Sequence, residues 1–269
     1  MKNHLKKTFY YGTDAQQFGH LYKPKESKVV PVVIVIHGGY WKDNHNLDSY
    51  ATSAIVGYLQ TMNVAIWNLE YRRMDALGEN SKAPWPASFK DVAEGIDYLR
   101  NIDKVENLDL NRLLLIGHSA GGHLATWAAS RKSISPDSEL YRQNPLPIKS
   151  VISIAAILNL FDVGDVDQPE QIERLMGGTA KTHPGRYLTC DPSSLYEPTI
   201  NITLVHGEQD TCVKVAQAKH YGDKSQGSVK QIIMSDADHF SMLPHDGFWV
   251  EDQWQQIKKL VELEIAALN

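Results

Sequence analysis

The sequence predicts an α/β fold in which helices cover both faces of a mostly parallel central sheet. Short apolar runs rich in β-branched residues alternate along the chain with segments of helical period. Such runs suit strands that are buried on both faces. Two glycine-rich stretches, HGGYW and GHSAGG, each follow one of these runs directly. The chain has 269 residues, 42% of them hydrophobic, and no low-complexity linker divides it, so we expect a single domain over 1–269.

The strands are predicted from the apolar runs. The five buried strands lie at 29–36, 64–71, 113–116, 151–157 and 200–205. A short strand is expected at 231–234, and the weakly alternating stretch QQFGHLYKP at 16–24 predicts an edge strand.

Helices are predicted where apolar residues recur at three- and four-residue spacing. Two such faces are formed by Phe89, Val92, Ile96 and Leu99, and by Trp254, Ile257, Val261 and Ile265. The long region 158–198 is rich in Asp, Pro and Gly around the short helical pattern PEQIERLMGG. Because so long a connection inside a compact domain is usually functional, it predicts a cap or lid insertion.

Charge and cysteine content narrow the class of partner. The formal net charge is -5, which gives no basic surface for nucleic acid or an anionic membrane, so we expect a small-molecule substrate. A homodimer is left open.

Cys190 and Cys212 form no C-x-x-C pair, and no Cys and His cluster has metal-site spacing, so neither metal nor cofactor is expected. With no apolar signal region or membrane-length run, we expect a cytoplasmic protein.

The stretch LLLIGHSAGGHLATWAA contains a G-x-S-x-G pattern at Gly117 to Gly121. A buried strand ends at its first glycine, and a helix of small residues begins just after Ser119. This strand, turn and helix hold a serine in a strained, exposed conformation, with the helix N-terminus directed at it. Ser119 is therefore the predicted nucleophile.

An acid and a base are expected later in the chain, at the ends of strands. Asp210 follows the strand at 200–205, and His239 follows the short strand after it. A histidine can take the serine proton and return it to the leaving group, while a carboxylate orients the ring. Glu208 is an alternative acid and His245 a rival base.

The acids next to His239 have a simpler explanation. Asp236 and Asp238 fit solvated loop charges that lie near the histidine only in sequence.

The bare backbone of HGGYW suits a group that binds a developing oxyanion. Attack by Ser119 creates negative charge that backbone N–H groups must reach without side chains in the way. The predicted oxyanion hole consists of the N–H groups of Gly39, Tyr40 and Ala120. We expect structural roles for four other histidines, which are His37, His118, His123 and His206. Of these, His37 should brace the HGGYW loop by hydrogen bonds.

The chain contains, in this order, the stretches HGGYW, GHSAGG, HGEQD and ADHF. Together they resemble the kynurenine formamidase (arylformamidase) branch of the α/β-hydrolase family, which is close to the hormone-sensitive-lipase-like esterases. The resemblance extends from YYGTDAQQFGHLYKP to the C-terminal helix. It implies an α/β-hydrolase fold and hydrolysis of N-formyl-L-kynurenine to kynurenine and formate. A metal-free serine mechanism would proceed through a formyl-Ser119 intermediate.

The residues beside the oxyanion loop bear on the acyl group. HGGYW replaces the H-G-G-G of the lipase-like esterases, so Tyr40 and Trp41 should shrink the acyl pocket toward formyl or acetyl. The predicted pocket comprises Gly38, Tyr40 and Trp41, although both aromatic rings could instead pack against the sheet.

Two other functions remain open. One is a carboxylesterase for short acyl groups on sugars or aryl alcohols, and the other is a catalytically silent hydrolase fold that binds a small ligand. An amino-acid head group would need a charged partner. The candidates are Arg72, Arg73 and Arg186, for which a surface role is equally open.

Overall fold

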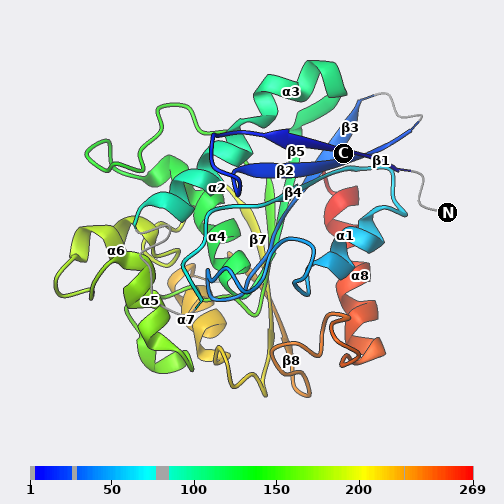
Figure 1. The fold of residues 1–269 in the computed structure, drawn as a ribbon. Coiled ribbons are helices and arrows are strands. Elements are labelled where there is room, and N and C mark those ends of the chain that lie inside the picture. Colours follow the sequence, from blue (N-terminus) through cyan, green and yellow to red (C-terminus); the bar gives the residue numbers. More distant parts are fainter. Residues whose placement is uncertain (1–3, 26–28, 77–84, 227, 269) are drawn as a thin grey trace.

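The computed structural model describes residues 4–25, 29–76, 85–226 and 228–268. Its eight described strands form one sheet in the order β1-β2-β4-β3-β5-β6-β7-β8 (Figure 1). The strands are β1 (His4–Tyr10), β2 (Phe18–Pro24), β3 (Val30–Ile36), β4 (Ala65–Leu69), β5 (Leu108–His118), β6 (Ser150–Ile154), β7 (Asn201–Gly207) and β8 (Lys230–Met234).

The sheet is parallel from β4 through β8 and antiparallel at its first two strands. The prediction of an edge strand at 16–24 is wrong, because β2 lies between β1 and β4. The missed strand β1 is largely exposed, so its sequence carries no burial pattern. The strand predicted at 151–157 is too long, since β6 ends at Ile154 and Ala155 adopts a positive φ.

Helices cover both faces of the sheet. They are α1 (Ser53–Leu59), α2 (Ala87–Asp97), α3 (Leu99–Glu106), α4 (Ala120–Ala129), α5 (Pro169–Met176), α6 (Pro184–Cys190), α7 (Ala216–Lys224) and α8 (Glu251–Ala266), with short 3₁₀ turns η1 (Ser130–Ser133) and η2 (Val163–Asp165). Side chains of α1 and α8 share one apolar cluster, and those of α2 to α7 share the other. The ribbons of α1 and α8 lie on one side of the sheet and those of α4 and α7 on the other (Figure 1). Alternate residues of β3 enter the two clusters, as a strand buried on both faces requires.

The two predicted helical faces are confirmed, since all eight of their apolar residues are buried. The first face spans two helices rather than one, because α2 ends at Asp97 and α3 begins at Leu99. Among the described residues, no helix has both the length and the apolarity needed to span a membrane.

The region 158–198 contains η2, α5 and α6 and lies over the carboxyl-end side of the sheet near α7 (Figure 1). Its apolar side chains, including Leu160, Ile172 and Tyr187, join the same core cluster as α4. The region therefore packs onto the domain through its own apolar residues. That it moves as a lid stays a prediction.

Candidate active site

Ser119 lies at the sharp turn between β5 and α4. Its backbone has φ 57° and ψ −125°, a conformation that costs a non-glycine residue energy and often marks a functional site. The neighbouring backbone passes closely. A Cβ at Gly117 would lie 2.2 Å from the carbonyl oxygen of Gly121, and a Cβ at Gly121 would lie 2.2 Å from that of Ile36. Both glycines are therefore needed to place Ser119 against the end of β3.

Asp210 and His239 form a buried hydrogen-bonded pair. Nδ1 of His239 lies 2.7 Å from Oδ2 of Asp210, while Oδ1 of the same carboxylate accepts the N–H groups of Cys212 and Val213. Burial would raise the pKa of the Asp210 carboxyl, but hydrogen bonds from His206 and His239 outweigh it and hold that pKa well below its usual range. Asp210 is therefore ionised and fixes the orientation of the His239 ring.

A cavity of about 190 Å³ brings the predicted nucleophile and base together. Ser119 and His239 both line it, along with Gly39 and Tyr40 of the HGGYW loop. The alternative acid Glu208 instead pairs with Lys219 at 3.7 Å. The structure thus brings Ser119, Asp210 and His239 together at one site.

The rival base and the two acids next to His239 lie outside this arrangement. His245 pairs with Asp246 at 3.3 Å. Asp236 and Asp238 are exposed, and Oδ1 of Asp238 accepts the N–H groups of Phe240 and Ser241.

The HGGYW loop carries three consecutive residues with positive φ. The values are 102° at Gly39, 50° at Tyr40 and 55° at Trp41. For two large side chains this conformation is strained. Ala120 is the first residue of α4, so its N–H has no acceptor within the helix. Gly39 and Tyr40 line the same cavity as Ser119, and Ala120 follows that serine directly. That the N–H groups of Gly39, Tyr40 and Ala120 form an oxyanion hole stays a prediction.

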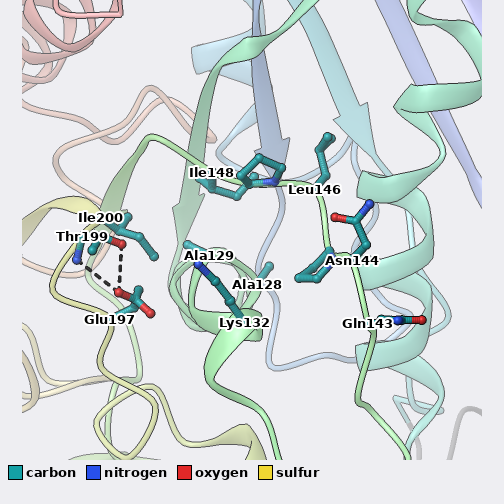
Figure 2. Close-up of a pocket in the computed structure, with 12 residues that line it drawn as sticks. Ala128, Ala129, Lys132, Gln143, Asn144, Leu146, Ile148, Glu197, Thr199 and Ile200 are labelled. Carbon is teal, nitrogen blue, oxygen red and sulfur yellow. Dashed lines mark hydrogen bonds between the residues drawn. The ribbon is translucent and has the colours of Figure 1, made fainter. Parts of the chain in front are cut away.

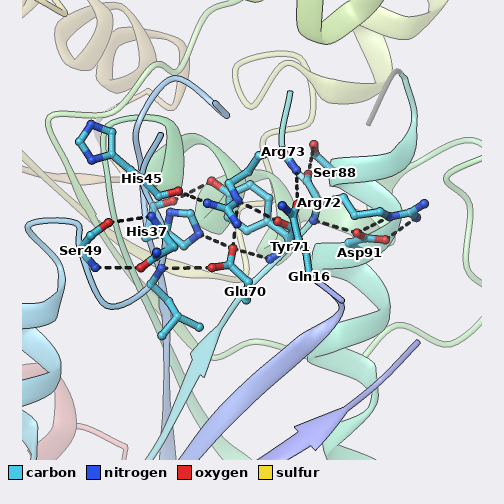
Figure 3. A network of polar contacts seen from close by, with 12 residues as sticks. Gln16, His37, His45, Ser49, Glu70, Tyr71, Arg72, Arg73, Ser88 and Asp91 are labelled. Atoms are coloured by element: carbon cyan, nitrogen blue, oxygen red, sulfur yellow. Dashed lines mark hydrogen bonds and ion pairs between the residues drawn. The ribbon is translucent and has the colours of Figure 1, made fainter. Parts of the chain in front are cut away.

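The buried carboxylate of Glu70 supports the HGGYW loop through His37 (Figure 3). Glu70 follows β4, and its Oε1 lies 2.8 Å from Nε2 of His37 and 3.2 Å from Nε of Arg73. It also accepts the N–H groups of Leu47 and Tyr71. Nδ1 of His37 lies 2.9 Å from the carbonyl oxygen of Gly38, so the ring joins Glu70 to the glycine loop. The predicted bracing role of His37 is confirmed.

Although burial alone would raise the pKa of the Glu70 carboxyl, interactions with His37 and Arg73 leave it below its ordinary value. The carboxylate is therefore ionised at neutral pH inside the core, where its stability depends on those partners.

Tyr50 is a site residue that the sequence did not indicate. Its hydroxyl lies 2.9 Å from Nδ1 of His118, whose Nε2 lies 2.7 Å from the carbonyl oxygen of His239. Because a carbonyl only accepts, His118 Nε2 carries the proton and Nδ1 accepts from Tyr50. Burial lowers the pKa of His118 to about 3, which keeps its ring neutral.

Burial also raises the pKa of the Tyr50 phenol, and hydrogen bonds from the Ser119 side chain and the Gly39 backbone partly offset that rise. The phenol oxygen therefore lies next to both the nucleophile and the oxyanion loop. No local pattern around Tyr50 could have shown this, because its partners lie in other segments of the chain.

Only one of the three predicted pocket residues lines the cavity. Tyr40 does so, and its hydroxyl donates to Asp167 and to the carbonyl oxygen of Cys212. Trp41 is fully buried and packs edge-on against His123, so the prediction that it lines the pocket is wrong. Gly38 also lies outside the lining. A Cβ there would lie 2.6 Å from the Tyr50 hydroxyl, so this glycine provides space for packing.

The remaining two predicted structural histidines hold loops together. His123 contacts the carbonyl oxygen of Cys190, and burial lowers its pKa to about 4. His206 contacts the carbonyl oxygen of Val213 and lies 3.3 Å from Asp210. Both histidines therefore support the site without lining its cavity.

The arginines considered for an amino-acid head group are occupied elsewhere. Arg72 pairs with Asp91, Arg73 with Glu70, and Arg186 donates to the carbonyl oxygen of Met176. Lys42, a charged residue that was not among the candidates, does line the cavity.

Within the described residues, one trio could hold a metal ion. Ligand atoms of Asp210, Cys212 and His239 lie within 4.8 Å of one another. An ion at this place would compete with the hydrogen bond between Asp210 and His239.

A second cavity of about 280 Å³ lies at the other end of the sheet (Figure 2). It is lined by Ala129 and Lys132 near the end of α4, by Ile148 before β6 and by Ile200 before β7. Ser119 lies at the opposite end of α4. This cavity is therefore separate from the candidate active site.

Comparisons with known proteins identify a family and a fold for this chain. The family described as BD-FAE matches residues 20–224. Esterase LipC of Mycobacterium tuberculosis is 28% identical over 233 residues, covering 80% of this chain but only 53%, about half, of LipC. The kynurenine formamidase of Meyerozyma guilliermondii is 27% identical over 221 residues, covering 79% of this chain and 78% of that protein.

Among solved structures, a truncated carbohydrate esterase from gut microbiota superposes with a TM-score of 0.75 at 20% identity, covering 98% of both chains. That likeness shows a shared fold.

Replacing the nucleophile tests the site assignment. We expect Ser119→Ala to lower kcat by roughly 10³-fold or more. The melting temperature should stay close to that of the wild type, because alanine meets the same backbone restriction at this φ. Steady-state kinetics and thermal melts check both. Ser153 is a buried serine on β6 that does not line the cavity. The control variant Ser153→Ala should therefore keep its activity. Full activity in Ser119→Ala would refute the assignment.

Replacing the bracing carboxylate tests the loop support. At neutral pH Glu70→Gln should lower the free energy of unfolding by about 3 kcal/mol, because it leaves Arg73 without its buried counter-charge and removes the carboxylate that contacts His37. Glu106→Gln is the matched control. Its partner Lys7 is half exposed, so about 1 kcal/mol or less is expected. Denaturant unfolding measures both variants.

The same variant has a pH signature. Because the pKa of Glu70 is lower in the folded chain, its stabilisation is present at neutral pH. That stabilisation is lost as the pH falls below about 4 and through the folded pKa. The difference between wild type and Glu70→Gln should therefore shrink on acidification. A constant difference would contradict the proposed ionisation.

Proposed function

The chain belongs to the BD-FAE family and has the α/β-hydrolase fold, and from that premise we propose that it is a serine hydrolase that removes the formyl group of N-formyl-L-kynurenine. The chain would then act in the breakdown of tryptophan to kynurenine. The observation that carries the proposal is the small cavity at Ser119, which has room for a small acyl group and contains one lysine.

The proposed reaction proceeds in two steps. His239 takes the proton of Ser119 as Oγ attacks the formyl carbon, and the N–H groups of Gly39, Tyr40 and Ala120 stabilise the oxyanion. His239 then gives the proton to the aniline nitrogen, which leaves as kynurenine. His239 then deprotonates a water that attacks the formyl-Ser119 ester, and it returns this proton to Oγ of Ser119 as formate is released. Asp210 stabilises the imidazolium form of His239 in both steps.

The acyl side of the cavity is restricted by Tyr40. Its backbone is fixed at positive φ, and its hydroxyl is anchored to Asp167 and Cys212, so the ring cannot move aside without breaking those bonds. Burial raises the pKa of this phenol and the Asp167 hydrogen bond raises it further, so the hydroxyl remains a donor. Longer acyl chains would overpack this wall.

Lys42 supports an anionic substrate. It is the only lysine or arginine among the described residues lining the cavity. Its Nζ lies 3.1 Å from Oε1 of Gln168 and 5.8 Å from the centre of the Tyr40 ring. No described carboxylate lies within ion-pair distance of it. A substrate carboxylate such as that of formylkynurenine would provide the missing counter-charge.

A carboxylesterase for short acyl groups is the second candidate. It is supported by LipC, which is as similar to this chain as the formamidase of Meyerozyma guilliermondii is. The same residues would perform that reaction, with an alcohol in place of the aniline.

An acyl-length series tests the role of Tyr40. Formyl and acetyl substrates should be turned over, while butyryl esters of the same phenol fall by roughly tenfold to a hundredfold in kcat/KM. Tyr40→Gly should recover part of that loss, because it opens the wall and tolerates the positive φ. Asn107→Gly, at an exposed position with φ 54°, should leave the ratio unchanged. A wild-type preference for butyryl would refute the proposal.

A matched substrate pair tests Lys42. Lys42→Met should lower kcat/KM on N-formylkynurenine by about tenfold, since it removes the charge facing the carboxylate. Formanilide, which has the aryl formamide but no carboxylate, should lose little. Lys42→Arg should restore activity, and Lys132→Met in the second cavity should change neither rate. Equal losses on both substrates would show that Lys42 does not recognise the carboxylate.

A further inference from the structure

A larger groove of about 610 Å³ adjoins the catalytic cavity. The two share Cys212, His239 and Phe240, so they are continuous. We call it the 248–250 groove, because its outer wall consists of Phe248, Trp249 and Val250. Neither the family resemblance nor the proposed catalytic roles account for this wall.

Three consecutive large apolar side chains are left uncovered at the groove. Phe248 is 80% exposed, Trp249 44% and Val250 41%. Single exposed apolar residues are common, but a run of three lining a cavity is typical of a binding surface.

The backbone beneath these side chains is held in place. The N–H of Phe248 donates to His245, and that of Val250 donates to Ser241, at 2.9 and 2.8 Å. Nε1 of Trp249 donates to Glu251 at 3.1 Å, which fixes the indole as well. The wall is therefore positioned in advance while its apolar area stays open to a ligand.

The direction of proton transfer indicates which part of a substrate would enter the groove. The base that takes the serine proton must return it to the leaving atom, so the leaving group lies on the His239 side. Tyr40 and Gly39 line the catalytic cavity but not the groove, so the acyl group that they confine stays in the catalytic cavity. His239 lines both the catalytic cavity and the groove, so a leaving group next to this ring can extend into the groove.

Charge further narrows the occupant. Among the described residues that line the groove, Asp238 is the only aspartate, glutamate, lysine or arginine. Its Oδ1 already accepts two backbone N–H groups, and no lysine or arginine is present among those lining residues to attract an anion. Flat, uncharged aromatic surface is the chemistry that Phe248 and Trp249 match best.

We propose that the 248–250 groove binds the aromatic part of the leaving group and that it prefers extended aromatic groups, larger than a single ring; a carboxylate on the leaving group would stay in the catalytic cavity next to Lys42. This inference rests on the proposed hydrolase function and adds an asymmetry to it. The acyl side is narrow and strict, whereas the leaving-group side is wide and selects for aromatic area.

Two acetate esters test the groove. Phenyl acetate and 2-naphthyl acetate share the acyl group, and their leaving groups have similar acidity, so their kcat/KM ratio reports contacts of the second ring. The wild type should favour the naphthyl ester by about tenfold. The double variant Phe248→Ser, Trp249→Ser should bring this ratio close to one. Its acetyl-to-butyryl ratio on phenyl esters should stay unchanged, because Tyr40 is intact.

Controls separate the possible failures. Tyr10→Ser removes an exposed ring from β1, away from both cavities, and should leave the naphthyl-to-phenyl ratio as in the wild type. Since Phe248 and Trp249 are exposed, the double variant should fold normally, which thermal melts verify. Free 2-naphthol should also inhibit the wild type more strongly than phenol, and this difference should vanish in the double variant.

An unchanged naphthyl-to-phenyl ratio in the double variant would overturn the groove assignment, while the short-acyl preference would still support the proposed function. A wild type that cleaves neither formyl nor acetyl substrates would overturn both.

Discussion

Contact of backbone with backbone at the start of α4 is the constraint on which the site depends. Because Gly121 has no side chain, the helix approaches the carbonyl oxygen of Ile36 at the end of β3. The HGGYW loop leaves β3 at that same point. One close contact therefore sets the distance between Ser119 and the loop that would stabilise its oxyanion. Any side chain at Gly121 would push the two apart.

Backbone strain is concentrated around this contact, and buried interactions offset it. Gly39, Tyr40, Trp41 and Ser119 all have positive φ, and three of these are not glycine. Burial of Trp41 in the core and the ion pair of Glu70 with His37 hold the loop in its strained form. Trp41 thus contributes to function by packing behind the loop, even though it does not touch the cavity.

Much of the sheet and the chemical core could be predicted from sequence, because both depend on local patterns. The run 29–36 is apolar throughout, and the G-x-S-x-G turn has few structural alternatives between a strand and a helix. Asp210 and His239 were identifiable because the ends of parallel strands meet at one edge of the sheet. By contrast, β1 has exposed side chains on both faces and gives no periodic signal.

The contacts that the sequence could not show join residues distant in the chain. Tyr50 reaches His118 across 68 positions, and Tyr40 reaches Asp167 across 127. Glu70 offered one signal, an acid directly after a buried strand, where an ionised side chain needs a partner. Its partner His37 could not be chosen among the histidines from sequence alone.

The two sides of the cavity are built from different kinds of structure, which bears on how specificity can change. The proposed acyl wall is Tyr40, whose position is tied to the strained loop and therefore to the proposed oxyanion donors. A substitution there that alters the backbone would disturb catalysis. The residues of the 248–250 groove project from an exposed segment whose backbone bonds do not involve their side chains, apart from the Trp249 indole. If the proposed roles hold, substitutions in the 248–250 groove would change the leaving-group preference and leave Ser119, Asp210 and His239 in place, whereas a change of acyl preference at Tyr40 would act on the catalytic backbone as well.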